Sequence, residues 1–317
     1  MKVIDHLDQA KRPLISFEII PPLRGGDFKS LMQLIEDLVA HRPPFIDITS
    51  HSAVVSYEEH GDGIRRVVKR KRPGTLGVCA LIQNKYNVDA VPHVICRGFT
   101  REETEDFMIE LRYLGIDNVL AIRGDDSGYS KPIAAGRTAN RHASELIAQI
   151  HDMNQGHYLE EITNADPTAF CVGAAGYPEK HFEAPNLPSC IKRVKEKVDS
   201  GAEYIVTQMF FDNAHYFRFV EQCRAEGITV PIIPGLKVLT SAKQLSRIPR
   251  TFHCDIPSAL AENIEAAPDR QGVIEVGVDW AVKQTEELIN RGVPSVHFYV
   301  MQKSSTINRV MEKLKLD

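Results

Sequence analysis

The sequence predicts a (β/α)8 barrel, the TIM-barrel fold of the α/β class. Short apolar runs rich in β-branched residues alternate with longer amphipathic segments along all 317 residues, the pattern of strands that are each followed by a helix. Eight such runs favour a closed barrel over an open doubly wound sheet, and no G-x-G-x-x-G follows any of them. The sequence contains no internal repeat and no low-complexity tract, so we expect one domain over 1–317, with extra helices in its loops.

The apolar runs give the order of the predicted elements. The predicted strands are 14–20, 45–49, 76–82, 117–122, 170–175, 203–209, 230–233 and 295–300. The predicted helices include 28–39, 101–114, 143–153, 191–200, 214–226 and 277–290. Four of these helices are followed by a glycine placed to end them, namely Gly115, Gly201, Gly227 and Gly292. Two inserts, 125–141 and 249–270, depart from the alternation, and such inserts usually lie in βα loops.

Composition argues against several classes of protein. The formal net charge of -4 leaves no basic footprint, so nucleic acid and anionic membranes are poor partners. The first residues are polar, and no window approaches the roughly 18 uninterrupted apolar residues of a membrane span. The six cysteines include no C-x-x-C pair, and several stand in apolar runs. We therefore expect a soluble cytoplasmic protein with reduced, structural cysteines.

Glu18 is the most informative single residue. It stands inside the apolar run 15–20, which stops at the double proline 21–22. Burying a charge there is costly, and desolvation raises the pKa of a carboxyl toward neutrality, where it can donate a proton. The alternative interpretation is a strand glutamate that faces a polar barrel end or pairs with a buried arginine.

The ends of the predicted strands carry an unusual number of polar groups. In a barrel the reacting side chains project from the C-terminal ends of the strands, so these groups are expected to meet on one rim. They comprise carboxylates, imidazoles, an amide and aromatic rings, in the segments 47–51, 92–93, 123–125, 177–181, 208–212 and 297–299.

These segments, taken in order, resemble the methylenetetrahydrofolate reductase family. The resemblance runs from about residue 13 to 303 and rests on the motifs at 16–22, 118–125, 175–179, 197–202, 207–212, 233–235 and 297–299. It implies FAD-dependent reduction of 5,10-methylenetetrahydrofolate to 5-methyltetrahydrofolate by NAD(P)H, with the two substrates using one flavin site in turn and the product feeding methionine synthesis. It implies no metal. NADH is the expected donor, because no Arg or Lys cluster beside an evident ribose site indicates a 2′-phosphate.

The resemblance also assigns roles to residues. Glu18 matches the general acid for the folate, and Asp125 matches an aspartate beside the flavin. Gln208 matches a glutamine that contacts nicotinamide and folate in turn, and Gln244 and Lys303 match substrate-side positions more loosely. The positions that line FAD are Thr49, His93, Arg123, Gly124, Asp125, His142, Ala143, Tyr177, His181, Ala184 and Lys197.

Each of these residues also has a structural interpretation. The segment 123–125 alone could be a turn with a local ion pair, and Gln208 could bond to the backbone at a strand end. His93 and His181 could be ordinary histidines with satisfied hydrogen bonds.

The chain also departs from the family pattern at several positions. Cys190 replaces an aspartate that binds FAD, His142 replaces a tyrosine, and Arg193 and Glu196 replace an Asn and an Arg. Ile248 stands where an aromatic residue is usual. These changes leave open a flavin-binding subunit that exchanges electrons with a partner protein. An unrelated barrel, such as an aldolase or a methyltransferase, is a third hypothesis. We expect a homo-oligomer.

Overall fold

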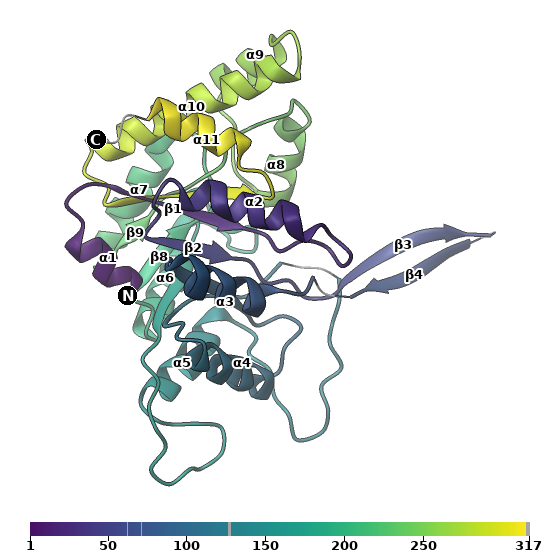
Figure 1. Ribbon diagram of the computed structural model, residues 1–317, viewed down its shortest axis with the longest axis vertical. Coiled ribbons are helices and arrows are strands. Elements are labelled where there is room, and N and C mark those ends of the chain that lie inside the picture. Colours follow the sequence, from purple (N-terminus) through teal and green to yellow (C-terminus); the bar gives the residue numbers. More distant parts are fainter. Residues whose placement is uncertain (62, 71, 126–127, 315–317) are drawn as a thin grey trace.

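The computed structural model describes residues 1–61, 63–70, 72–125 and 128–314, and its centre is a parallel sheet curled into a barrel (Figure 1). Nine strands pair in the order β10-β11-β1-β2-β5-β6-β7-β8-β9. Their bounds are β1 (Leu14–Ile19), β2 (Phe45–Ile48), β5 (Asp89–Ile95), β6 (Asn118–Ile122), β7 (Cys171–Gly176), β8 (Tyr204–Thr207), β9 (Ile232–Ile233), β10 (Gly235–Leu236) and β11 (Ser295–Met301). The two short strands flank Pro234 and share the seventh barrel position, since β9 pairs with β8 and β10 pairs with β11. The predicted (β/α)8 barrel is confirmed.

Helices cover the outside of the barrel (Figure 1). They are α1 (Val3–Gln9), α2 (Phe28–Val39), α3 (Thr75–Tyr86), α4 (Arg101–Tyr113), α5 (Ala143–Asn154), α6 (Leu187–Asp199), α7 (Asn213–Ala225), α8 (Gln244–Phe252), α9 (Ser258–Glu265), α10 (Arg270–Asn290) and α11 (Ser305–Lys313). The four glycines expected to end helices do follow α4, α6, α7 and α10, and each has a positive φ that a side chain would strain. The extra helices predicted in loops are α8 and α9, which lie between β10 and β11.

One predicted strand is wrong. Residues 76–82 belong to helix α3, where Thr75, Val78, Cys79 and Ile82 are buried at the i, i+3, i+4, i+7 spacing of one helix face. A short apolar run has no periodicity that separates a strand from a buried helix, which explains the error. The third barrel strand is β5, so Pro92 and His93 lie inside a strand and not after one.

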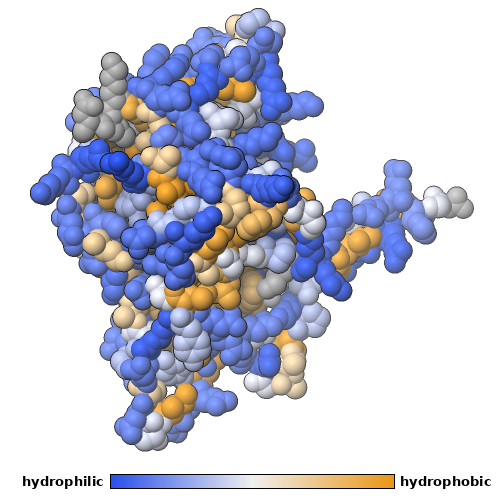
Figure 2. Space-filling view, viewed as in Figure 1, coloured by the Kyte–Doolittle hydropathy of each residue, from blue (hydrophilic) through white to orange (hydrophobic). Residues whose placement is uncertain are grey.

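The sequence also gave no indication of a projecting arm. Strands β3 (Val54–His60) and β4 (Gly63–Lys69) form an antiparallel hairpin that extends away from the barrel between β2 and α3 (Figure 1). Apolar side chains lie exposed along it (Figure 2), and Tyr57 and Ile64 keep 71% and 74% of their surface. Both strands contain charged residues next to one another, so the sequence lacks the regular alternation of apolar and polar residues that predicts a strand.

Two apolar layers hold the barrel together. The larger one lies between the strands and the surrounding helices, and includes Phe17, Leu38 and Ile147. The smaller one fills the barrel at the N-terminal ends of its strands, where Val3 and Leu7 of α1 pack with Phe45 and Tyr204. Helix α1 therefore closes this end, and the opposite end remains for polar groups.

The remaining expectations from composition concern membranes and cysteines. Among the helices that the structure describes, none has the length and apolar character that crossing a membrane requires. All six cysteines are buried and unbridged, so each occupies the place of a small apolar side chain.

Candidate active site

A layer of polar side chains lies inside the barrel, above the apolar layer that α1 closes. Glu18 on β1 and Asp47 on β2 are Cα partners in the parallel ladder, so their side chains enter the barrel at one level. His93 comes from β5 and His297 from β11. The Nε2 atom of His93 lies 3.4 Å from Oε2 of Glu18 and 3.6 Å from Oδ2 of Asp47. Four ionisable groups therefore share one buried space.

Glu18 occupies the position that its apolar surroundings predict. It keeps 8% of its surface, and burial raises the pKa of its carboxyl to about 7, although His93 acts in the opposite direction. Its nearest ionisable partner is an imidazole and not the buried arginine of the alternative interpretation. A carboxyl with this pKa carries a proton for part of the time at neutral pH, as a general acid requires.

Sequence reasoning missed Lys237 as a member of this layer, and it placed Tyr299 on the rim without assigning it a role. The Nζ atom of Lys237 donates a 2.7 Å hydrogen bond to the carbonyl oxygen of Tyr299, and burial lowers the pKa of the ammonium to about 8. The hydroxyl of Tyr299 donates a 2.5 Å hydrogen bond to the carbonyl oxygen of Thr207. Gly235 allows this approach, since a Cβ there would lie 2.3 Å from the same Thr207 oxygen. Only the strand register could have revealed this arrangement.

A second polar group lies at the C-terminal ends of β6 and β7. The rings of Tyr177 and His181 meet edge to face with centroids 4.7 Å apart. Lys197 on α6 reaches the same place: its Nζ donates 2.8 Å to the carbonyl of Ala175 and lies 5.8 Å from the centre of the Tyr177 ring. Burial lowers the pKa of Lys197 to about 8. The structure thus brings together these three predicted cofactor residues.

Arg123 belongs to this second group and also forms a local ion pair. Its Nη1 lies 2.7 Å from Oε2 of Glu183, and this partner raises the pKa of the guanidinium. The ion pair is the structural interpretation considered for this turn, with a partner from the loop after β7. Gly124 follows with φ +86°, a conformation that disfavours a side chain, and Asp125 is exposed.

The other predicted residues are placed as follows. Buried Thr49 and the ring of His51 share a 3.0 Å hydrogen bond, and Ala143 is buried at the start of α5. The amide of Ala184 donates to the carbonyl of His181. Oε1 of Gln208 accepts from the amide of Met209 at 2.9 Å, the backbone bond that its structural interpretation anticipates.

Three of the predicted site residues make no described hydrogen bond or ion pair with Glu18. His142 is exposed and caps α5, Gln244 opens α8 with its Oε1 accepting from the Thr240 amide, and Lys303 is exposed after β11. Within the described ranges, no hydrogen bond or ion pair links any of them to Glu18. Arg193 and Glu196 form an exposed ion pair with each other on α6.

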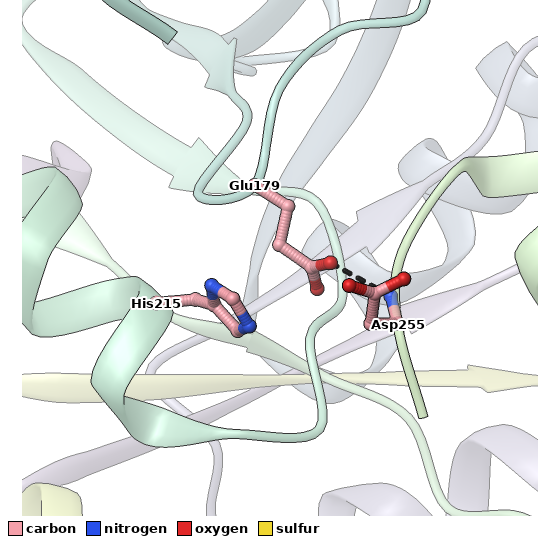
Figure 3. A group of neighbouring side chains, drawn as sticks. All are labelled: Glu179, His215 and Asp255. Carbon is pink, nitrogen blue, oxygen red and sulfur yellow. Dashed lines mark hydrogen bonds between the residues drawn. The ribbon is translucent and has the colours of Figure 1, made fainter. Parts of the chain in front are cut away.

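A further cluster on the rim comes from three separate segments. Glu179, His215 and Asp255 place possible metal-ligand atoms within 4.8 Å of one another (Figure 3). Oε2 of Glu179 accepts a 2.7 Å hydrogen bond from the amide of Asp255, and burial raises the pKa of Glu179 to about 7. His215 already shares a 2.8 Å hydrogen bond with Arg218. We therefore interpret the cluster as a carboxyl pair beside an imidazole, which sequence spacing gave no means of finding.

The donors of the second polar group suit FAD. A diphosphate needs cations, which Arg123 and Lys197 can supply, and a flat ring system needs an aromatic neighbour such as Tyr177. Burial lowers the pKa of His181, so this ring can contribute an N–H donor and not a fixed charge. Cys190 is buried beside Lys197 and Tyr177, whose pKa values its thiol influences, so it faces this group as the family comparison implies.

Comparisons with known proteins agree on one family. A family model described as methylenetetrahydrofolate reductase matches residues 2–315. Methylenetetrahydrofolate reductase 1 of Schizosaccharomyces pombe is 30% identical over 324 residues, covering 100% of this chain and 49% of that protein. The 5,10-methylenetetrahydrofolate reductase of Escherichia coli is 27% identical over 292 residues, which cover 92% of this chain and 86% of that protein. The chain thus spans about half the length of the yeast relative.

A solved structure shows the same fold. It is described as an uncharacterized protein from Clostridium thermocellum that binds two copies of 5-methyl-5,6,7,8-tetrahydrofolic acid. The TM-score is 0.58 at 12% sequence identity, with 98% of this chain and 96% of that chain covered.

Proposed function

Because this chain belongs to the methylenetetrahydrofolate reductase family, we propose that it reduces 5,10-methylenetetrahydrofolate to 5-methyltetrahydrofolate with FAD and a reduced nicotinamide. We propose NADH as the donor and 1–317 as a single catalytic domain. The observation that carries the proposal is the buried Glu18 carboxyl beside His93 at the open end of a barrel. This carboxyl is protonated for part of the time at neutral pH, and opening a methylene bridge requires such an acid.

The proposed task of Glu18 is to deliver its proton to the folate. The methylene group of the substrate bridges two nitrogens, and protonating one of them lets that C–N bond break to leave an iminium. A carboxyl with a pKa of about 7 is matched to this transfer near neutral pH. His93, at 3.4 Å, remains close enough to stabilise the carboxylate that is left behind.

The residues of the second polar group would hold the cofactor. FAD, when bound, carries the hydride from the nicotinamide to the folate. Arg123 and Lys197 would neutralise its diphosphate, His181 would donate a hydrogen bond, and Tyr177 would contact a ring. We propose that the cofactor is also lined by Thr49, Gly124, Ala143 and Ala184. Exposed Asp125 would place its negative charge toward the ring and the cationic iminium.

Gln208 would serve both substrates in turn. Its side-chain oxygen already accepts a backbone amide, so its NH2 group would contact the nicotinamide first and the folate afterwards. Sharing one site in this way gives ping-pong kinetics, because the first product has to leave before the second substrate enters. Gln244 and Lys303 would act at the outer, folate-side edge.

The visible spectrum of the purified protein tests this proposal. We expect flavin absorption, bleaching when NADH is added without oxygen, and recovery of the absorption when methylenetetrahydrofolate follows. A protein without flavin would contradict the proposal. A flavin that NADH cannot bleach would favour electron exchange with a partner protein. Repeating the titration with NADPH identifies the preferred donor.

A further inference from the structure

A second carboxyl lies beside Glu18 in the barrel and has no assigned task. Asp47 is 0% exposed, and among the described residues neither of its carboxyl oxygens has a hydrogen-bond partner. An unpaired carboxylate in such a place costs several kcal/mol, so the protonated acid is the form that fits it. Burial accordingly raises the pKa of Asp47 well above its usual range.

Two imidazoles connect this carboxyl to Glu18. Nε2 of His93 approaches both acids, at 3.4 Å from Glu18 and 3.6 Å from Asp47, and has no hydrogen-bond partner of its own in the described chain. His297 approaches both as well, with its Nε2 4.0 Å from Glu18 and its Nδ1 4.0 Å from Asp47. The hydroxyl of Ser16 and Nδ1 of His297 share a 2.8 Å hydrogen bond, which fixes that ring.

The geometry points to one proton-sharing acid pair, in which Asp47 is a positioning residue that keeps Glu18 supplied with a proton across Nε2 of His93. This inference rests on the proposed role of Glu18 as the acid. Two carboxyls in one buried space cannot both ionise readily, because the first negative charge opposes the second. A proton that leaves Asp47 for His93 Nε2 and passes to Glu18 leaves the total charge of the pair unchanged.

The other ionisable groups around Glu18 and Asp47 do not take over the sharing of this proton. Burial lowers the pKa values of both His93 and His297, so the imidazoles are neutral carriers and not fixed cations. Lys237 is the ammonium that faces Glu18, and Asp125 opposes it with a negative charge. Among the residues that the structure describes, the remaining groups that face the pair are a thiol and two phenols, all with pKa values raised by burial: Cys79, Tyr204 and Tyr299.

The first test is the pH dependence of the folate half-reaction. A shared proton keeps a fraction of Glu18 protonated after the pair has lost its first proton, so the alkaline decline is delayed in the natural protein. In Asp47→Asn, Glu18 titrates alone, and we expect the decline to move to lower pH by about one unit, the coupling that defines an interacting pair. Asp47→Ser, which also cannot ionise, is expected to give the same shift if the Asn variant folds poorly.

A matched control comes from the same barrel interior. Tyr204→Phe removes another buried oxygen that lacks a hydrogen-bond partner in the described chain, without removing an acid that titrates near neutrality. We expect its decline to occur at the wild-type pH. An unshifted decline in both Asp47 variants, or an equal shift in Tyr204→Phe, would overturn the inference.

The second test needs no reaction and separates this inference from the proposed function. Infrared spectroscopy follows the carbonyl stretch of protonated carboxylic acids in the isolated protein during a pH titration. With a shared proton, the acid left in Glu18→Gln or Asp47→Asn loses its proton at lower pH than the last buried acid of the natural protein. Two independent transitions, each removed by one variant without moving the other, would contradict sharing even if folate is not the substrate.

Discussion

Lys237 Nζ is held by the carbonyl oxygen of Tyr299 at 2.7 Å, within electrostatic reach of the Glu18 carboxyl. The two groups perturb each other in a buried space, since the ammonium lowers the pKa of Glu18 and the carboxyl raises that of Lys237. Burial dominates both, and leaves the pKa of Glu18 at about 7 and that of Lys237 at about 8. The acidity of Glu18 is therefore the balance of a large effect of desolvation and smaller charge effects.

Replacing Lys237 by Met tests this balance. Loss of the ammonium removes an influence that lowers the pKa of Glu18, so this pKa is expected to rise by up to roughly one unit. The folate half-reaction should then persist to higher pH in stopped-flow measurements. Lys237→Arg retains the charge and is expected to stay near the natural profile. A Met variant whose profile moves to lower pH would show that Lys237 does not act on Glu18 in this way.

Glu18→Gln separates the two half-reactions. Gln has nearly the same shape but cannot give up a proton, so oxidation of the reduced flavin by methylenetetrahydrofolate is expected to slow by about 10²- to 10⁴-fold. Reduction of the flavin by NADH does not use this acid and is expected to stay close to the natural rate. Rapid mixing of each substrate with the variant measures both steps. A normal folate step would remove Glu18 from the mechanism.

Two glutamates are expected to contribute less to stability as the pH rises from about 4.5 to about 7. Glu18 and Glu179 both have folded pKa values of about 7, above the ordinary 4.5 of the unfolded chain. At these two glutamates the folded state binds more protons than the unfolded state in this window, so their contribution favours unfolding as the pH rises. The buried histidines, whose pKa values are lowered, contribute in the opposite direction. Glu179→Gln keeps an oxygen for the Asp255 amide and should remove the share of the pH dependence that belongs to Glu179, which a series of thermal melts at different pH values measures.

The control for that series is Glu265→Gln on the exposed surface of α9. It removes a carboxyl of the same kind, and we expect the natural slope of melting temperature against pH to remain. A Glu179 variant that melts with the natural slope would show that this carboxyl does not take up a proton on folding.

Lys197 is expected to contribute to FAD affinity. Hydrogen bonds to charged groups contribute about 1.5 to 3 kcal/mol, so Lys197→Met should weaken FAD binding by roughly tenfold or more in a titration of the apoprotein. Lys195→Met, two residues away on α6, breaks an exposed ion pair with Asp199 and serves as the control. Equal affinities in the two variants would place Lys197 outside the cofactor site.

The sequence was informative where a signal is local. Glu18 could be found because an acid inside an apolar strand is unusual, and the helix-ending glycines because positive φ favours glycine. The sequence could not show that Asp47 and Lys237 lie beside Glu18, because this depends on the register of β1, β2 and the strands near β10, which no local pattern encodes. The strand assigned to 76–82 failed because a seven-residue apolar run fits either a helix face or a buried strand.

The closure of the barrel at Pro234 has a consequence for local opening. Most of the wall is joined by continuous ladders, but here β9 and β10 contribute two residues each, and proline has no N–H to donate. The amide of His297 donates to the Pro234 carbonyl at 2.9 Å and spans the interruption. The barrel wall is therefore closed by short pairings at this point, next to Lys237. Among the barrel strands, amide hydrogen exchange is expected to be fastest at 232–236. Local opening of this segment would let solvent protons reach the buried polar layer.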